Sequence, residues 1–97
     1  PDIRFDCGFY QLIVEIDEFQ HRSSTYSCDE QRMRNIIGNL GLPCIFIRYN
    51  PDNTTSDVNI LLKVISEYID IDIDNKDDYP WKNDDHGMYV HYLFYKT

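Results

Sequence analysis

The stretch Leu12-Ile13-Val14-Glu15-Ile16-Asp17 decides the fold, because it reads as a buried β-strand that carries two carboxylates. Glu15 and Asp17 are two residues apart, so their side chains point to the same side of a sheet. Removing a carboxylate from water costs several kcal/mol unless a cation or hydrogen-bond donors compensate. The strand is therefore expected to need a positive partner, and a divalent metal ion is the first candidate.

A second strand is predicted directly before this one. Residues 3–7 alternate between apolar and charged side chains, which is typical of a short strand, and Gly8 marks a turn. The close connection to the strand at residues 11–17 favours an antiparallel hairpin. Asp6 is then able to face Glu15 across the hairpin, although the sequence does not determine the register.

A helix is predicted after a polar loop at residues 18–26. Residues 27–30, Ser-Cys-Asp-Glu, fit a capping box, and the helix runs from there to about Leu40. Its apolar stripe includes the position of Asp29 and has Arg32 at its edge. We therefore expect Asp29 to face the sheet, near the ends of the strands.

The second half of the chain predicts a central strand, a second helix and a last strand. The continuous apolar run at residues 44–47 is typical of a strand covered on both faces, and Arg48 ends it. Three further parts follow: a helix at about 57–69 capped by Ser56, an acidic irregular segment at 70–85, and an aromatic-rich strand at 88–95. The order β-β-α-β-α-β describes a small α/β sandwich.

Length and composition fit one small domain. The chain has 97 residues and is 42% hydrophobic, enough for a real core. It has no apolar run of membrane length and no signal-peptide pattern, so the chain is expected to be soluble. Cys7, Cys28 and Cys44 include no CxxC pair, and reduced thiols in an intracellular protein are the simplest interpretation. The start at Pro1-Asp2, directly before a strand, favours a single domain, residues 1–97, trimmed from a longer protein.

The formal charge of −8 is concentrated in one segment. Residues 66–85 hold eight acids and two lysines. Without Asp6, Glu15 and Asp17, the first 65 residues are neutral. Because no basic patch stands out in the sequence, we do not expect a tight, self-sufficient binder of nucleic acid.

Three carboxylates are candidate ligands of one divalent ion. Asp6, Glu15 and Asp17 come from two adjacent strands, and hard oxygen ligands suit Mg²⁺. Such an ion activates a water molecule and stabilises a phosphate transition state. The alternative is an exposed sheet face that carries ordinary acids. This alternative is weak for Glu15, whose neighbours are apolar, and stronger for Asp6 and Asp17 at strand ends.

Four further residues are candidates around this site. His21 is suited to proton transfer near neutral pH, or is an ordinary loop histidine. Asp29 holds His21 or a metal-bound water, pairs with Arg32, or is a first-turn acid favoured by the helix dipole. Arg32 and Arg48 each hold a phosphate or pair with the buried carboxylates.

The spacing of these residues resembles the active-site strands of the PD-(D/E)XK nucleases. The matching residues are Phe5-Asp6, the stretch from Ile13 to His21, Asp29, Arg32, Ile36, Gly41 and the stretch from Ile45 to Arg48. The chain looks most similar to the very-short-patch-repair-like branch, which includes phage homing endonucleases with the motif EDxHD. The resemblance covers about residues 4 to 51.

The resemblance implies a restriction-endonuclease-like fold, a small mixed sheet flanked by helices. Carried over, Asp6 takes the place of the metal-binding Asp of the first strand. Glu15 and Asp17 stand at the (D/E)xK positions, and His21 and Asp29 match the later His and Asp of the motif.

The chain departs from the family pattern at three positions. Phe5 replaces the usual Pro before Asp6, Asp17 stands where a lysine is typical, and Glu18 stands where relatives often have Gly. The N-terminal helix of the family is also absent from the sequence. These departures affect the role of Asp17 more than the fold.

Together, these observations lead us to expect a metal-dependent DNA endonuclease. Mg²⁺, for which Mn²⁺ substitutes, would bind Asp6, Glu15 and Asp17, assisted by His21 and Asp29. The substrate would be double-stranded DNA, bound with help from a separate DNA-binding domain or from homodimerisation, in the cytoplasm of a phage or virus host. The alternatives are a non-catalytic interaction module with a nuclease fold, and an RNA-directed nuclease.

Overall fold

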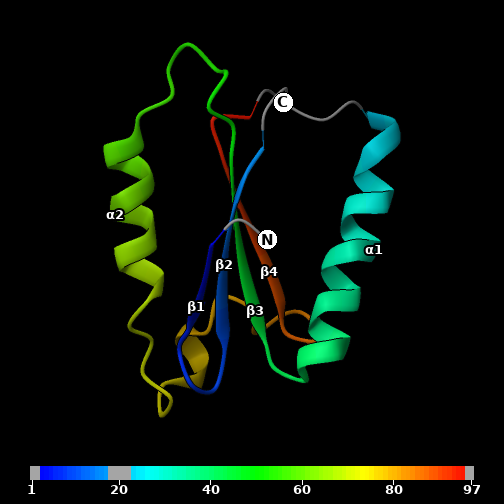
Figure 1. Ribbon diagram of the computed structural model, residues 1–97. Coiled ribbons are helices and arrows are strands. Elements are labelled where there is room, and N and C mark those ends of the chain that lie inside the picture. The colour runs from blue at the N-terminus through cyan, green and yellow to red at the C-terminus, as the bar shows by residue number, and fades with distance from the viewer. Residues whose placement is uncertain (1–2, 18–22, 96–97) are drawn as a thin grey trace.

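Figure 1 shows a mixed β-sheet that lies between two helices, so the fold has three layers, α/β/α. The computed structural model describes residues 3–17 and 23–95, the latter with side chains from Asp29 onward. The elements are β1 (Ile3–Asp6), β2 (Gln11–Ile16), α1 (Ser23–Leu40), β3 (Cys44–Tyr49), α2 (Val58–Tyr68), the 3-10 helix η1 (Lys76–Asp78) and β4 (Met88–Leu93). The predicted α/β class and the order β-β-α-β-α-β are confirmed.

The sheet has the strand order β1-β2-β3-β4. β1 and β2 form the predicted antiparallel hairpin, whereas β2, β3 and β4 are parallel to one another. Parallel neighbours need a crossover connection, and α1 and α2 provide the two crossovers. The carboxyl ends of β2, β3 and β4 therefore lie at one end of the sheet.

The two faces of the sheet carry separate apolar cores. The face under α1 is built around Ile13, Cys44 and Phe46 of the sheet with Met33 and Ile37 of the helix. The face under α2 is larger, and its buried residues are Tyr10, Leu12, Val14, Ile45, Ile47, Tyr49, Leu61, Val64, Trp81 and Leu93. Every residue of β3 is buried, as predicted for a central strand covered on both sides.

The two crossovers have opposite hands. β2, β3 and β4 follow one another in one direction across the sheet, while α1 and α2 lie on opposite faces (Figure 1). Nearly all such connections are right-handed, so one of the two departs from the usual hand. The result is that β3 is covered by one helix on each face.

Both helices begin at residues other than those predicted. α1 begins at Ser23, so Ser27 lies inside the helix and does not cap it. Ser, Thr and Tyr cost only about 0.5 kcal/mol each in a helix, and no Gly or Pro separates residues 23–26 from the rest. α2 is capped by Asp57, whose side chain accepts a hydrogen bond from the Asn59 N–H at 2.8 Å.

The acidic segment between α2 and β4 is attached to the sheet by aromatic side chains. Trp81 is buried and packs on Tyr79, with ring centroids 4.7 Å apart, and on Tyr10 at 5.2 Å. Figure 1 shows this segment at the end of the sheet where β1 turns into β2. The acids of the segment therefore lie away from the carboxyl ends of β2 and β3.

Gly87 connects this segment to β4 through a close approach to Pro43. Its φ of +82° is a left-handed conformation that favours glycine, and its carbonyl accepts a hydrogen bond from the Cys44 N–H at 2.8 Å. A Cβ atom at this position would lie 2.9 Å from the Pro43 Cβ. Position 87 thus lacks room for a side chain.

Neither of the two helices in the described part of the chain is long and apolar enough to cross a membrane.

Candidate functional site

Three carboxylates meet one guanidinium at the carboxyl ends of β2 and β3, on the face that α1 covers. Glu15 and Asp17 come from β2 and the residue after it, Asp29 comes from α1, and Arg48 comes from β3. The parallel register places Glu15 beside Arg48. The Nη2 atom of Arg48 lies close to one oxygen of each acid: 4.0 Å from Glu15, 2.9 Å from Asp17 and 3.4 Å from Asp29.

A second arginine, Arg32 of α1, covers Glu15. Its Nη1 donates to Glu15 Oε1 at 3.0 Å and its Nη2 donates to Oε2 at 2.5 Å, so the pair is bidentate. This hydrogen bond, opposed by burial, raises the pKa of Arg32 above its ordinary value. We call Glu15, Asp17, Asp29, Arg32 and Arg48 the acid–arginine cluster.

The two arginines differ in their access to solvent. The side chain of Arg48 is 2% exposed, whereas that of Arg32 is 44% exposed. Arg48 is therefore an internal counter-ion held within the fold, and Arg32 closes the cluster from outside. With three acids and two arginines, the cluster has a formal charge of −1.

Tyr95 completes the cluster, although nothing in its sequence context distinguished it from the other aromatic residues near the C-terminus. Its hydroxyl donates a hydrogen bond to Asp17 Oδ2. Burial raises the pKa of Tyr95 above its ordinary value, so the hydroxyl keeps its proton and remains a donor. The side chains that sequence reasoning singled out near Asp17 were charged ones, and a phenol two residues after the last strand gave no comparable signal.

A left-handed residue directs Tyr95 toward the cluster. Phe94, which directly follows β4, has a φ of +64°, a conformation that costs a non-glycine residue free energy. Its carbonyl accepts hydrogen bonds from the side-chain amides of Asn50 at 3.3 Å and Asn53 at 2.9 Å. Its ring packs on Tyr49, with centroids 5.7 Å apart. These contacts hold the chain in the turn that brings Tyr95 over Asp17.

Asp6 does not belong to this cluster, and the expectation that it faces Glu15 is wrong. The register pairs Asp6 with Gln11, four residues before Glu15. At about 3.4 Å per residue, this separates the two positions by about 14 Å along the strand. Asp6 instead accepts hydrogen bonds from the Gly8 N–H and the Gln11 side chain, both at 3.0 Å, which lower its pKa. Its role is in the hairpin turn.

The remaining predicted residues have mixed outcomes. Asp29 is the seventh residue of α1, so it is not a first-turn acid, and its side chain does face the sheet. Arg32 and Arg48 pair with carboxylates, which was one of their two expected roles. His21 lies outside the described residues.

The donor chemistry of the cluster suits a hard cation, but its present arrangement does not form a metal cage. Carboxylate oxygens are the ligands that Mg²⁺ prefers, and one or two carboxylates with several waters suffice. Within residues 3–17 and 29–95, no group of three or more His, Cys, Asp or Glu side chains is arranged to hold a metal ion. Arginine nitrogens lie against the same oxygens that a metal would use.

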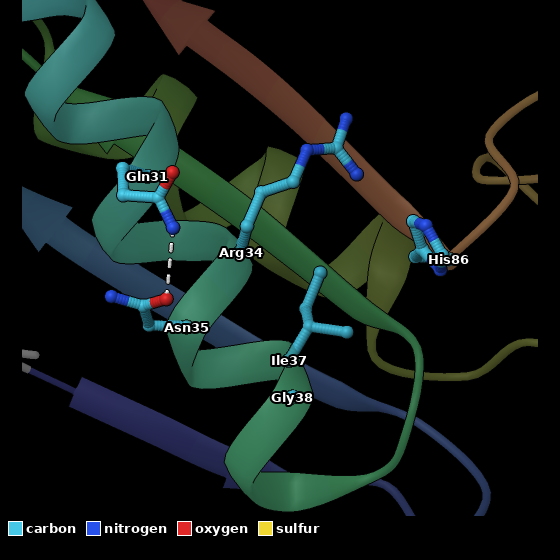
Figure 2. Close-up of a pocket in the computed structure, with 6 residues that line it drawn as sticks. All are labelled: Gln31, Arg34, Asn35, Ile37, Gly38 and His86. Carbon is cyan, nitrogen blue, oxygen red and sulfur yellow. Dashed lines mark hydrogen bonds between the residues drawn. The ribbon is translucent and has the colours of Figure 1, made fainter.

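A separate pocket of about 320 Å³ lies along the more C-terminal part of α1. Figure 2 shows that Gln31, Arg34 and Asn35 project from the helix and that His86 lies across from them; Ile37 and Gly38 also line the pocket. Gln31 donates a hydrogen bond to Asn35 at 3.0 Å. No residue of the acid–arginine cluster lines this pocket, so it is not part of the site described above.

Comparison of the chain with protein-family models, curated proteins and solved structures found no match to any of them.

Proposed function

We propose that the chain is a metal-dependent endonuclease domain that hydrolyses phosphodiester bonds of double-stranded DNA, of the homing-endonuclease or very-short-patch-repair-like type. The observation that carries this proposal is the meeting of Glu15, Asp17 and Asp29 at one point, the Nη2 atom of Arg48. Three acids, two from β2 and the residue after it and one from α1, are costly to bring together without cations, and two arginines leave the cluster with a formal charge of −1.

The fold supports the same proposal. Ligands of open α/β sheets bind in the crevice outside the carboxyl ends of parallel strands, which is where this cluster lies. A mixed sheet flanked by helices is also what the resemblance to PD-(D/E)XK nucleases implies. The acidic segment lies at the other end of the sheet (Figure 1), so its negative charges do not cover the proposed site.

Each residue of the cluster has a proposed role. Glu15 is the principal ligand of Mg²⁺ or Mn²⁺, assisted by Asp17 or Asp29, and the ion supplies an activated water and offsets phosphate charge. Arg48 holds the acids in place. Arg32, which lies beside Glu15 and is 44% exposed, is the proposed contact for a phosphate of the substrate. His21, close to Asp17 in sequence, is the proposed proton carrier. Because the chain has a net charge of −8, its affinity for DNA would come from a separate domain or from dimerisation.

Nicking of supercoiled plasmid in Mg²⁺ or Mn²⁺ tests the proposal. Glu15→Gln keeps the shape of the side chain and removes its charge, so we expect nicking to fall by at least about 100-fold, more than typical losses for residues that only support a ligand. Glu67→Gln, an exposed position on α2, is the matched control and should nick like the wild type. Equal activity of wild type and Glu15→Gln would contradict the proposal. Structured RNA, offered in parallel, distinguishes an RNA-directed nuclease.

The position of Asp6 is a second testable point. β1 runs antiparallel to β2 with Ile3 opposite Val14, so the end of β1, where Asp6 lies, is at the opposite end of the sheet from Glu15. We therefore expect Asp6→Asn to leave nicking nearly unchanged. A strong loss of nicking in Asp6→Asn would restore Asp6 as a ligand.

A non-catalytic interaction module is the second candidate function. It is favoured by the pairing of Glu15 with Arg32, because a carboxylate that is already neutralised needs no metal. Calorimetric titration with Mn²⁺ separates the two candidates. The nuclease should bind Mn²⁺ and lose that binding in Glu15→Gln, whereas the interaction module should show no binding in either form.

A further inference from the structure

The bidentate pair between Arg32 and Glu15 occupies the oxygens on which the proposed metal site depends. Both guanidinium Nη atoms donate to Glu15, one to each carboxylate oxygen, at 3.0 and 2.5 Å. A divalent ion bound to either oxygen would lie within reach of the like charge of the guanidinium, and the two cations would repel each other strongly. Arg32 and the metal are therefore alternative occupants of Glu15.

We propose that Arg32 is an exchangeable counter-ion of Glu15, one that protects the carboxylate in the resting protein and leaves it when a divalent cation binds. The inference rests on the proposed metal-dependent function. It assigns a positioning role to Arg32 that differs from that of Arg48, although both residues are arginines in the same cluster.

The surroundings of the two arginines support this division. Arg32 extends from α1 and is 44% exposed, so its guanidinium can turn into solvent without disturbing the core. Arg48 is 2% exposed and is held between Asp17 at 2.9 Å and Asp29 at 3.4 Å, so its removal from the cluster would break the fold locally. Arg48 lies 4.0 Å from Glu15, too far for a hydrogen bond. Arg32 therefore supplies the closest cationic contact to Glu15 among the contacts described above.

Exchange has a consequence for affinity. When a site is available only in a fraction of the molecules, the apparent dissociation constant rises by the inverse of that fraction. If the pair is closed in about nine molecules of ten, metal binding is weakened about 10-fold. A phosphate group that accepts the released guanidinium would remove this penalty, because arginine binds phosphate in the same bidentate manner as carboxylate. Metal and DNA would then bind cooperatively.

Calorimetric titration of Mn²⁺ into the wild type and four variants, with Glu15→Gln as the variant that lacks the ligand, tests the inference. Arg32→Gln removes the competitor, and we expect its dissociation constant for Mn²⁺ to be about 10-fold lower than that of the wild type. Arg32→Lys keeps the charge but loses the planar fork, so an intermediate value is expected. Arg34→Gln removes a neighbouring charge of α1 that pairs with Asp84, and it should bind Mn²⁺ like the wild type. Circular dichroism confirms that each variant is folded.

The outcomes separate this inference from the proposed function. Equal affinity of wild type and Arg32→Gln, with binding lost in Glu15→Gln, would leave the metal site intact and overturn the exchange. An equal gain in Mn²⁺ affinity in Arg34→Gln would mean that the loss of any positive charge on α1 strengthens binding. That result would also overturn the exchange. Absence of Mn²⁺ binding in all variants would refute both the metal site and the inference. A direct readout is the ¹⁵Nε signal of Arg32, which should shift more during a Mg²⁺ titration than that of Arg48.

Discussion

At the scale of single residues, Arg48 is the member of the cluster whose removal should destabilise the fold most. It is among the most deeply buried large side chains of the protein, and its guanidinium faces acids from β2 and α1. A buried arginine of this kind is weak evidence for stability in itself, because desolvation offsets much of the attraction. Removing Arg48 alone should be strongly destabilising, because Asp17 and Asp29 then remain buried beside each other without this cation.

Arg48→Met should therefore destabilise the protein by about 3–5 kcal/mol. Arg32→Gln leaves the buried Glu15 without its bidentate partner but retains a hydrogen-bond donor at a half-exposed position, so it should cost less, about 1–3 kcal/mol. Urea denaturation followed by the fluorescence of the single tryptophan measures both. A loss for Arg48→Met as small as that for Arg32→Gln would mean that the acids relax into solvent when Arg48 is absent.

Sequence reasoning placed part of this site and missed the rest for identifiable reasons. The period of two along β2 and the helical phase of α1 predict that Glu15 and Asp29 point toward the same region. Hairpin register depends on the turn and on packing across both faces, so the position of Asp6 was not determined by local pattern. Tyr95 reaches Asp17 because Phe94 takes a left-handed turn, and a phenylalanine gives no warning of that conformation.

At the scale of elements, α1 is joined to the turn before β4 by an ion pair. Arg34 donates two hydrogen bonds to Asp84, at 3.0 and 3.3 Å, and Asp84 also accepts from the N–H groups of His86 and Met88. These bonds, that from Arg34 above all, hold the pKa of Asp84 well below its usual range. Arg34 also lines the pocket in Figure 2.

This lowered pKa predicts a pH dependence of stability. The folded protein binds the Asp84 proton less readily than the unfolded chain, so the contribution is present above an ordinary Asp pKa of about 3.9 and is lost as the pH falls below it. Asp84→Asn should therefore be less stable than the wild type at pH 7, with a difference that shrinks toward pH 2. Thermal unfolding from pH 7 to pH 2 measures this. A constant difference across the range would place the effect in packing.

The elements themselves follow from sequence more closely than their ends do. The buried run of β3 and the apolar stripe of α1 each predict one element in the right place. The capping box at residues 27–30 was misleading, because a local capping pattern does not stop a helix when the residues before it also tolerate helical backbone. The opposite hands of the two crossovers have no local signal at all, since they depend on which face of the sheet each helix covers.

At the scale of the whole molecule, the two ends of the sheet differ in charge and in aromatic packing. The acid–arginine cluster lies at the carboxyl ends of β2 and β3, and the acidic segment lies at the hairpin end (Figure 1). The segment has no regular structure beyond η1, yet it is part of the fold because Trp81 is buried in the core under α2. Most of the net charge of −8 therefore lies at the hairpin end of the sheet and not at the proposed site.

Trp81→Ala should detach this segment. Loss of a buried tryptophan costs about 3–5 kcal/mol, a large part of the stability of a domain of this size. Urea denaturation followed by circular dichroism measures the loss, and faster proteolysis within residues 70–87 marks where the chain opens. Trp81→Phe retains an aromatic ring and should recover part of the stability. If Trp81→Ala were as stable as the wild type, the segment would be an independent appendage.

The approach of Gly87 to Pro43 has an evolutionary consequence. Two separate restrictions act on position 87, the left-handed backbone and the lack of space beside the proline ring. Of the other residues, asparagine and aspartate tolerate that backbone best, but neither fits beside proline. Homologous chains should therefore keep glycine at position 87 wherever position 43 is proline, and asparagine or aspartate should occur there only together with a smaller residue at position 43. Correlated substitution of positions 43 and 87 among homologous chains would reveal this contact, which a single sequence does not show.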